Sequence, residues 1–169
     1  RFASFDNNLD EKFSESIKVY TNENLKSHFE AINKIIKKAE KNFSDHIEDI
    51  ILILDTDQLF TIDISLTKNL DRSSKINKLY EPLILELNQI IKSNYDKYYL
   101  SQIIIDKCII DDEKIFEEFP KDKIVDNNLK VDFKLICFPK LFIKKIKDHF
   151  IKFNLNIINI FCSSYIKSQ

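Results

Sequence analysis

The chain has 169 residues, of which 44% are hydrophobic and 31% are charged, and 26 Lys and Arg residues balance 27 Asp and Glu residues. This composition suits one domain with its own core, and a formal net charge of −1 excludes a global field that would gather nucleic acid or anionic lipid. Glycine is absent, whereas phosphate-binding loops need glycine where backbone amides approach the anion. We therefore expect a binding or assembly module, with no catalysis and no cofactor of its own.

The three cysteines, Cys108, Cys137 and Cys162, are widely spaced in apolar surroundings. They are predicted to be reduced core thiols of a cytosolic protein. The apolar runs are too short to cross a bilayer, and no signal peptide is visible. Because the chain begins with Arg1 and not Met, we expect its natural beginning to be missing.

The first third of the chain predicts one strong helix between weaker elements. Residues 2–19 are weakly patterned and allow one or two short strands. A helix is expected from about Asn24 to Asn42. Its apolar stripe has steps of three and four residues and consists of Leu25, Phe29, Ile32, Ile36, Ala39 and Phe43.

The middle of the chain changes from helical to alternating patterns. Ile47–Leu54 predicts a strand buried on both faces. Phe60–Leu66 alternates apolar and polar residues, which indicates a half-buried strand. A helical region opens near Ser73, and we expect Pro82 to split it and to begin the better helix, Pro82–Lys92.

The last part of the chain predicts further strands and one helix. Tyr98–Ile110 and Leu129–Cys137 are expected strands, separated by an acidic loop over Asp111–Val125. The remaining elements are a helix over Lys140–Phe153, a left-handed residue at Asn154 and a strand over Ile157–Cys162. The sum is an α+β fold with mostly antiparallel strands and helices on one face.

Two stretches of the chain resemble the bacterial actin-like cell-division protein FtsA. Ala31-Ile32, Ile36–Lys41 and Ile47–Leu54 are similar to a helix ending in "A-I-x-x-A-E" and its following strand "I-x-x-V-x-V-x-I". Ile103–Asp111 resembles the strand "H-V-I-P-x-x-Y-x-I-D", with Cys108 in place of tyrosine.

The second stretch continues toward the end of the chain. Leu129–Cys137 is similar to "L-x-V-x-V-H-L-I-T", and Lys140–Leu155 to a helix ending in "x-G-L-x-V", with Asn154 replacing the glycine. Phe161–Tyr165 resembles "L-A-S-S-Y". Together the similarity covers most of residues 25–165 in the order of the family.

The resemblance implies a partial actin-like subdomain 1A, formed by residues 1–55 and 155–169. An inserted strand-helix-strand-strand (SHS2-like) subdomain 1C would occupy residues 56–154. It further implies a cell-division scaffold that contacts the FtsZ ring and other divisome proteins and can self-associate. Such a module is cytoplasmic, at the inner face of the membrane at the division site, and reaches the membrane only indirectly.

Several parts of the family pattern are missing. The glycine-bearing phosphate loop "D-I-G-T/S" does not occur near Arg1, and the chain stops at Gln169, before the second loop. The chain is therefore expected to be a fragment or a reduced relative. ATP binding would need a longer parent that supplies the missing loops.

The predicted contact element is the loop Asp111–Val125, together with an aromatic cluster at the start of the preceding strand, Tyr98–Ile110. Loops on a rigid scaffold often carry binding residues, and aromatic residues often anchor interfaces. The alternative interpretation is that these aromatic residues pack at the edge of the core. The predicted interface residues are Asp112, Glu113, Phe116, Glu117, Phe119, Lys121, Tyr95 and Tyr98.

Acidic and histidine residues offer weaker alternatives. Asp45-His46 with Glu48-Asp49 could supply metal ligands, but a solvated turn between helix and strand is the favoured interpretation. Asp55 and Asp57 form a D-x-D pair after a strand, where a turn is the competing interpretation. His28 and His149 have no neighbouring cysteine or serine in sequence with which to form a nucleophilic pair.

Three other functions remain open. A pilus-assembly actin relative such as PilM carries a similar insertion. A small α+β domain that binds nucleic acid or a ligand would need a basic face, which Asp63, Asp106 and Asp132 on the predicted strands weaken. An enzyme comes last because no nucleophile–base pair is visible.

Overall fold

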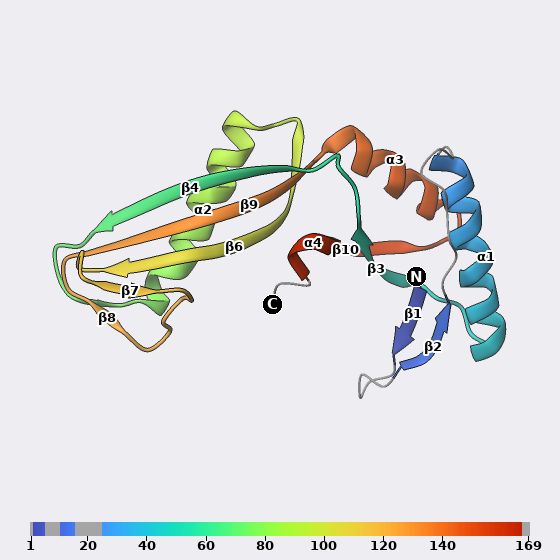
Figure 1. Cartoon of the computed structure of the whole chain (residues 1–169), viewed down its shortest axis with the longest axis horizontal. Helices are drawn as coiled ribbons and strands as arrows, with labels where there is room; N and C mark the ends of the chain where they lie inside the picture. The colour runs from blue at the N-terminus through green and yellow to red at the C-terminus, as the bar shows by residue number, and fades with distance from the viewer. Residues whose placement is uncertain (1, 6–10, 16–24, 167–169) are drawn as a thin grey trace. The chain divides into compact units, whose positions relative to one another are not determined.

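The computed structural model describes residues 2–5, 11–15 and 25–166. They form an α+β structure that divides into two compact units (Figure 1). Unit 1 comprises Arg1–Ile50 and Asp148–Ile158, and unit 2 comprises Ile51–Lys147 and Asn159–Gln169. The assignment of these parts to actin-like and SHS2-like subdomains stays a prediction.

Unit 1 begins with an antiparallel hairpin and one long helix. Strands β1 (Phe2–Phe5) and β2 (Glu11–Glu15) pair with each other, which agrees with the short strands expected there. Helix α1 spans Leu25–Phe43, and the expected starting residue Asn24 lies outside the described residues. The predicted stripe is confirmed at its centre, because Ile36 and Ala39 are buried there.

The core of unit 1 packs α1 against the segment Asp148–Ile158. Phe29 of α1 and Phe150 meet edge to face, with ring centroids 5.7 Å apart. Such aromatic pairs bury large apolar areas and prefer this geometry. The buried residues of the unit are Phe29, Ile35, Ile36, Ala39, Phe150 and Leu155.

Strands β3 (Asp49–Leu54) and β10 (Asn156–Cys162) pair in a two-stranded sheet. The prediction that the first of these is buried on both faces is wrong. Its residues alternate between exposed and half-buried, and the side chains of Ile51 and Ile53 are 55% and 54% exposed. A strand with both faces covered needs layers on both sides of an extended sheet, and a two-stranded ribbon lacks them.

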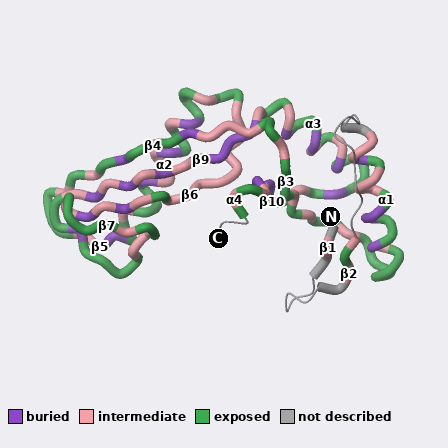
Figure 2. The backbone as a smooth tube through the Cα atoms, viewed as in Figure 1, coloured by how far each residue is buried: buried purple, intermediate pink, exposed green. Residues whose placement is uncertain are grey.

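Unit 2 contains a four-stranded antiparallel sheet in the order β4-β9-β6-β7. Its strands are β4 (Phe60–Asn69), β9 (Asn128–Pro139), β6 (Tyr98–Ile110) and β7 (Lys114–Phe116). The three long strands lie where the sequence predicts them. Figure 2 shows buried and more exposed positions alternating along β4 and much of β9, the two-residue period of a half-buried sheet.

Helix α2 (Asn77–Asn94) covers one face of this sheet with Leu83, Leu87 and Ile91. The expectation that Pro82 splits the helix is wrong, because the helix continues through it. Proline removes one backbone donor, and Pro82 is exposed, so water can reach the carbonyl that loses its partner. The core facing the helix contains Ile62, Leu66, Ile76, Cys108, Ile110, Val125, Leu129, Val131, Phe133, Leu135 and Cys137.

The segment predicted as an acidic loop contains two short strands, and this prediction needs correction. The first is β7, and the second is β8 (Ile124–Val125), which pairs with β5 (Ser74–Lys75). Strand β7 folds back on the end of β6 as a short hairpin, with Ile110 opposite Lys114, whereas β8 pairs with a strand about fifty residues earlier. Neither strand is long enough for a periodic pattern to appear in the sequence.

The last elements agree with the predicted order. Helix α3 spans Lys140–Ile151, and α4 (Ser163–Ile166) follows β10. Asn154 has φ of 58°, the left-handed conformation expected after a helix. Without glycine, the described chain uses other residues at such positions, which are Ser44, Asp111, Asp112 and Asn154.

Candidate interaction surface

Strand β4 is one edge of the four-stranded sheet. It pairs with β9 along all ten residues, from Phe60 opposite Cys137 to Asn69 opposite Asn128, without a register shift. Within the described ranges, no strand pairs with its other side. In Figure 1, β4 lies along the outer border of the sheet, with α2 behind.

The backbone groups that face this open side follow from one hydrogen bond. The N–H of Leu70 donates to the carbonyl of Asn127 at 2.8 Å, and this pair continues the β4–β9 register. In an antiparallel ladder, hydrogen-bonded and non-hydrogen-bonded pairs alternate. The even-numbered residues of β4 therefore direct their N–H and C=O groups toward β9. The odd-numbered residues direct theirs to the open side, and they are Thr61, Asp63, Ser65, Thr67 and Asn69.

We call these five outward-directed residues the β4 edge. Four of them are exposed and Thr61 is half-buried. Asp63 is the only charged residue among them, and its carboxylate lies 4.0 Å from the Lys134 ammonium of the neighbouring strand. Lys68, on the opposite face of the strand, forms an ion pair with Glu86 of α2. Unpaired strand edges of this length readily accept another strand.

The other border of the sheet is protected. In the described part of the chain, strand β7 pairs only with Cys108–Ile110 of β6, and β6 carries register shifts at Ser101 and Asp106. Ser101 donates to the carbonyl of Ile160 at 2.6 Å, and Gln102 accepts from the N–H of Cys162 at 2.8 Å. Bulges and covering segments prevent further strand pairing. Among the residues that the structure describes, the β4 edge has neither a bulge nor a covering strand.

The outer face of the sheet, opposite α2, holds a small charge network. The Lys134 ammonium lies 3.3 Å from Asp106 and 4.0 Å from Asp63. The hydrogen bond that Lys134 donates to the Asp106 carboxylate raises the pKa of Lys134, and the charges of Asp106 and Asp63 add to the shift. Because two carboxylates surround this one lysine, the outer face of the sheet is not basic here.

The structure separates the predicted interface residues into two groups at opposite ends of β6. Tyr95 and Tyr98 lie at its start, where both rings pack near Phe60, with centroids 5.9 and 4.7 Å away. Both tyrosines are half-buried against the core of unit 2. Their role as interface anchors stays a prediction.

The second group lies at the far end of β6. Phe116 and Phe119 pack against the core, and Phe119 meets Tyr80 edge to face at 5.0 Å. Asp112 accepts a hydrogen bond from the Asn128 amide at 2.7 Å. The remaining predicted residues are exposed, and they are Glu113, Glu117 and Lys121.

Asp111 fixes the base of this loop. Its carboxylate accepts the backbone N–H groups of Asp126, Asn127 and Asn128, at 2.7 Å for the closest. These bonds, that of Asn127 first, lower the pKa of the Asp111 carboxyl, because they favour its charged form. Asp111 was predicted as the first residue of the contact loop, but neither its role in fixing the loop nor the β4 edge was predicted. The alternation of β4 was visible, but its place at the border of the sheet depends on strand order.

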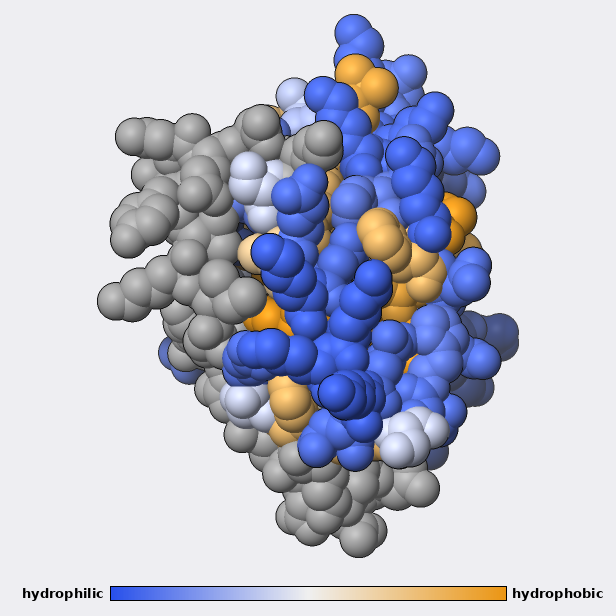
Figure 3. Space-filling view, turned by 90° about the vertical axis from the view of Figure 1, so that its right-hand side faces the viewer, coloured by the Kyte–Doolittle hydropathy of each residue, from blue (hydrophilic) through white to orange (hydrophobic). Residues whose placement is uncertain are grey.

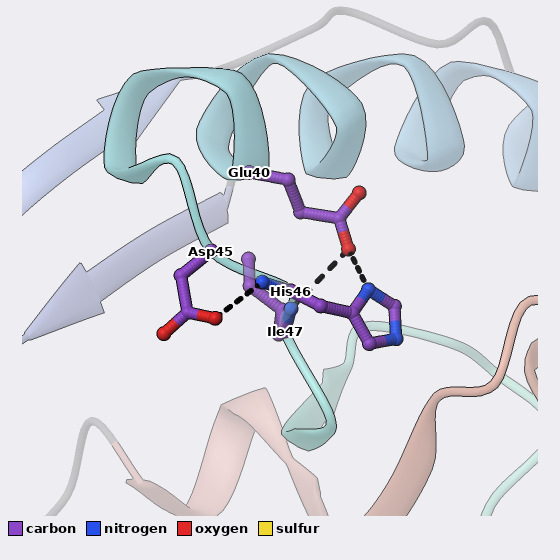
Figure 4. A network of polar contacts seen from close by, with 4 residues as sticks. All are labelled: Glu40, Asp45, His46 and Ile47. Atoms are coloured by element: carbon purple, nitrogen blue, oxygen red, sulfur yellow. Dashed lines mark hydrogen bonds and ion pairs between the residues drawn. The ribbon is translucent and has the colours of Figure 1, made fainter.

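The acidic and histidine residues near the end of α1 form a network in unit 1 (Figure 4). Glu40 accepts hydrogen bonds from the His46 ring and, at 3.2 Å, from the Ile47 backbone. Asp45 accepts the N–H of His46 at 2.8 Å. These contacts tie the helix end to the next strand. Within the described ranges, no three His, Cys, Asp or Glu side chains gather as a metal site would require.

A cavity of about 70 Å³ lies beside this network. Pockets that hold drug-sized ligands have volumes of roughly 300–1,000 Å³, so this cavity has no room for a nucleotide. Its lining is mixed and consists of Asn33, Ile36, Lys37, Glu40, His46, Phe153 and Leu155.

The remaining candidates occupy ordinary structural positions. Asp55 and Asp57 are exposed in the turn before β4, where the Gln58 N–H donates to the Thr56 hydroxyl at 3.1 Å. Cys108 and Cys137 are buried, and burial raises the pKa of both thiols to about 11. These two thiols therefore stay protonated and unreactive at neutral pH.

His149 belongs to the aromatic core of unit 1. Its ring stacks on Phe29 at 4.2 Å and lies 5.1 Å from the ring of Phe153. The Asn33 amide is 3.1 Å from Nε2 of His149. Burial, followed by the charge of Lys152, lowers the pKa of His149, and Glu30 opposes the shift.

We expect unit 1 to lose stability as the pH falls below about 6.5, the ordinary pKa of histidine. Because the folded-state pKa of His149 is lowered, the unfolded chain binds the proton first, and acid favours unfolding. His149→Phe keeps the stacking on Phe29 and removes this titration. Chemical denaturation at pH 7.5 and pH 5.5 should show a smaller loss for the variant. Equal losses in the two proteins would exclude His149 as the cause.

Surface hydropathy, helix length and similarity to known proteins do not indicate which class of partner the chain binds. Among the described residues seen in Figure 3, the surface is mostly hydrophilic, with small separate hydrophobic patches. Among the helices that the structure describes, none combines the length and apolar content needed to cross a membrane. No protein-family model matches the chain, and no curated protein is significantly similar to it.

Proposed function

We propose that the chain is a scaffold module that works through protein contacts, of the type found in FtsA. The observation that carries this proposal is the β4 edge. Along this ten-residue strand, the backbone donors and acceptors on the side away from β9 have no partner strand among the described residues. A partner segment would add to the sheet as a further strand. Main-chain hydrogen bonds supply affinity in this mode of recognition, and side chains beside the strand supply specificity.

The resemblance to FtsA directs the choice of partners. A division scaffold would contact the FtsZ ring, other divisome proteins or its own kind at the inner face of the membrane. The PilM-like alternative keeps the same surface and replaces the partners with pilus-assembly proteins. The actin-like and SHS2-like assignments of the two segments belong to this proposal.

A proline substitution on the β4 edge tests the docking surface. Thr67→Pro removes an N–H that points away from β9, so every β4–β9 hydrogen bond remains. Thr67→Ala is the matched control, because it removes the same side chain and keeps the N–H. Each protein is measured for binding to purified FtsZ, other divisome proteins and pilus-assembly proteins from the same cell.

We expect one partner to bind the wild type and Thr67→Ala alike, and to bind Thr67→Pro about tenfold or more weakly, since strand addition depends on edge hydrogen bonds. Circular dichroism and thermal unfolding check that Thr67→Pro is folded. Binding to none of these proteins would overturn the scaffold proposal. Equal binding by a folded Thr67→Pro protein would overturn the role of the β4 edge.

A further inference from the structure

We propose that the occupant of the β4 edge is the same edge of a second copy of this chain, paired antiparallel about a two-fold axis through Ser65. This inference rests on the proposed docking function and names its partner. The two copies would form one continuous sheet with both α2 helices on the same face. Such an isologous contact closes on itself and ends growth at a dimer.

The spacing of the outward-directed residues sets the pairing. Ser65 is the middle one of the five, with two on each side. A two-fold axis through Ser65 pairs Thr61 with Asn69 and Asp63 with Thr67 of the second copy. In this register every residue of the β4 edge meets another of the same set, and each such pair exchanges two backbone hydrogen bonds.

Charge also favours this register. Asp63 and Lys68 are the charged residues of β4, and in this register they face Thr67 and Ile62 of the second copy. An axis through Asp63 or Lys68 would set two like charges directly opposite each other, which destabilises a cross-strand pair. Lys68 also keeps its ion pair with Glu86 of its own chain.

The apolar face of the strand matches itself in the same register. Ile64 would lie opposite Leu66, and Phe60 opposite Leu70 of the second copy. All four side chains already line or contact the core beneath α2. Pairing of the two edges therefore extends one apolar layer across the joined sheet, and aliphatic and aromatic cross-strand pairs stabilise such a contact.

Cysteine cross-linking of the full chain tests the register. Ser65→Cys should cross-link to itself with a short bismaleimide, because directly paired residues have Cα atoms about 5.5 Å apart. Thr61→Cys alone should not cross-link, since the two copies of residue 61 would lie roughly 27 Å apart at 3.4 Å per residue. A mixture of Thr61→Cys and Asn69→Cys proteins should cross-link. The three native cysteines are buried, and cross-linking of the wild type measures any background from them.

Analytical ultracentrifugation supplies the second measurement. The wild type and Thr67→Ala should show a concentration-dependent species of about twice 20.1 kDa. Thr67→Pro should raise the dimer dissociation constant about tenfold or more. A wild type that stays monomeric at high concentration, or self-cross-linking of Thr61→Cys, which indicates parallel pairing, would overturn the proposal.

The two proposals fail in different ways. If the wild type is monomeric but binds a division or pilus protein through a Thr67→Pro-sensitive contact, self-pairing is wrong and the scaffold function stands. If the chain forms the expected dimer and binds none of those proteins, self-pairing stands and the scaffold function is wrong.

Discussion

Truncating Phe150 to alanine is expected to destabilise unit 1 by about 3–5 kcal/mol, because it leaves a cavity in a packed core. Phe150 is fully buried and touches Phe29 and His149, with centroids 5.7 Å away in each case. Chemical denaturation followed by circular dichroism measures the change. A loss of this size approaches the whole stability of a small domain.

Ile151→Ala is the matched control for this substitution. Ile151 is the next residue of α3, and its side chain is 64% exposed. An exposed truncation should change the free energy of unfolding by less than about 0.5 kcal/mol. Equal effects of the two variants would contradict the position of Phe150 in the core.

The second large effect is expected for Leu87→Ala in α2, with a loss of about 2–5 kcal/mol in unit 2. Leu87 is fully buried between the helix and the sheet. Since the sheet holds the β4 edge, this variant should also weaken any contact made through that edge. Urea unfolding gives the stability, and cross-linking of Ser65→Cys in the Leu87→Ala background gives the effect on the edge.

Leu85→Ala makes the same chemical change two residues earlier in the same helix. The Leu85 side chain is 63% exposed, so its loss should cost less than about 0.5 kcal/mol. The comparison removes helix propensity as an explanation, because both variants replace leucine by alanine within α2. A larger loss for Leu85→Ala than for Leu87→Ala would contradict the observed orientation of the helix.

Local periodicity predicted most of the elements. Steps of three and four residues indicated α1, and strict alternation indicated β4 and β9, because these patterns reflect which side of each element is covered. The left-handed Asn154 was also predictable, since a chain without glycine must place another residue after a helix. These features depend on neighbours in sequence.

Other features depend on contacts between distant residues, and the sequence did not reveal them. The apolar run of β3 predicted burial on both faces. Among the described strands, however, β3 pairs with β10 alone, and Ile51 and Ile53 are exposed. Strand β8 is too short for a period to appear, and it exists through pairing with the distant β5. Strand β7 is equally short, although its partner residues at the end of β6 are close in sequence.

The candidate surface shows the same division. The alternation of Phe60–Leu66 established a half-buried strand, and the polar residues between the apolar ones established its outer face. Which strand stands at the border of the sheet is decided by the order β4-β9-β6-β7. The place of β4 in that order arises from its pairing with β9, more than fifty residues away. Only the tertiary structure therefore showed that one side of β4 has no partner strand among the described residues.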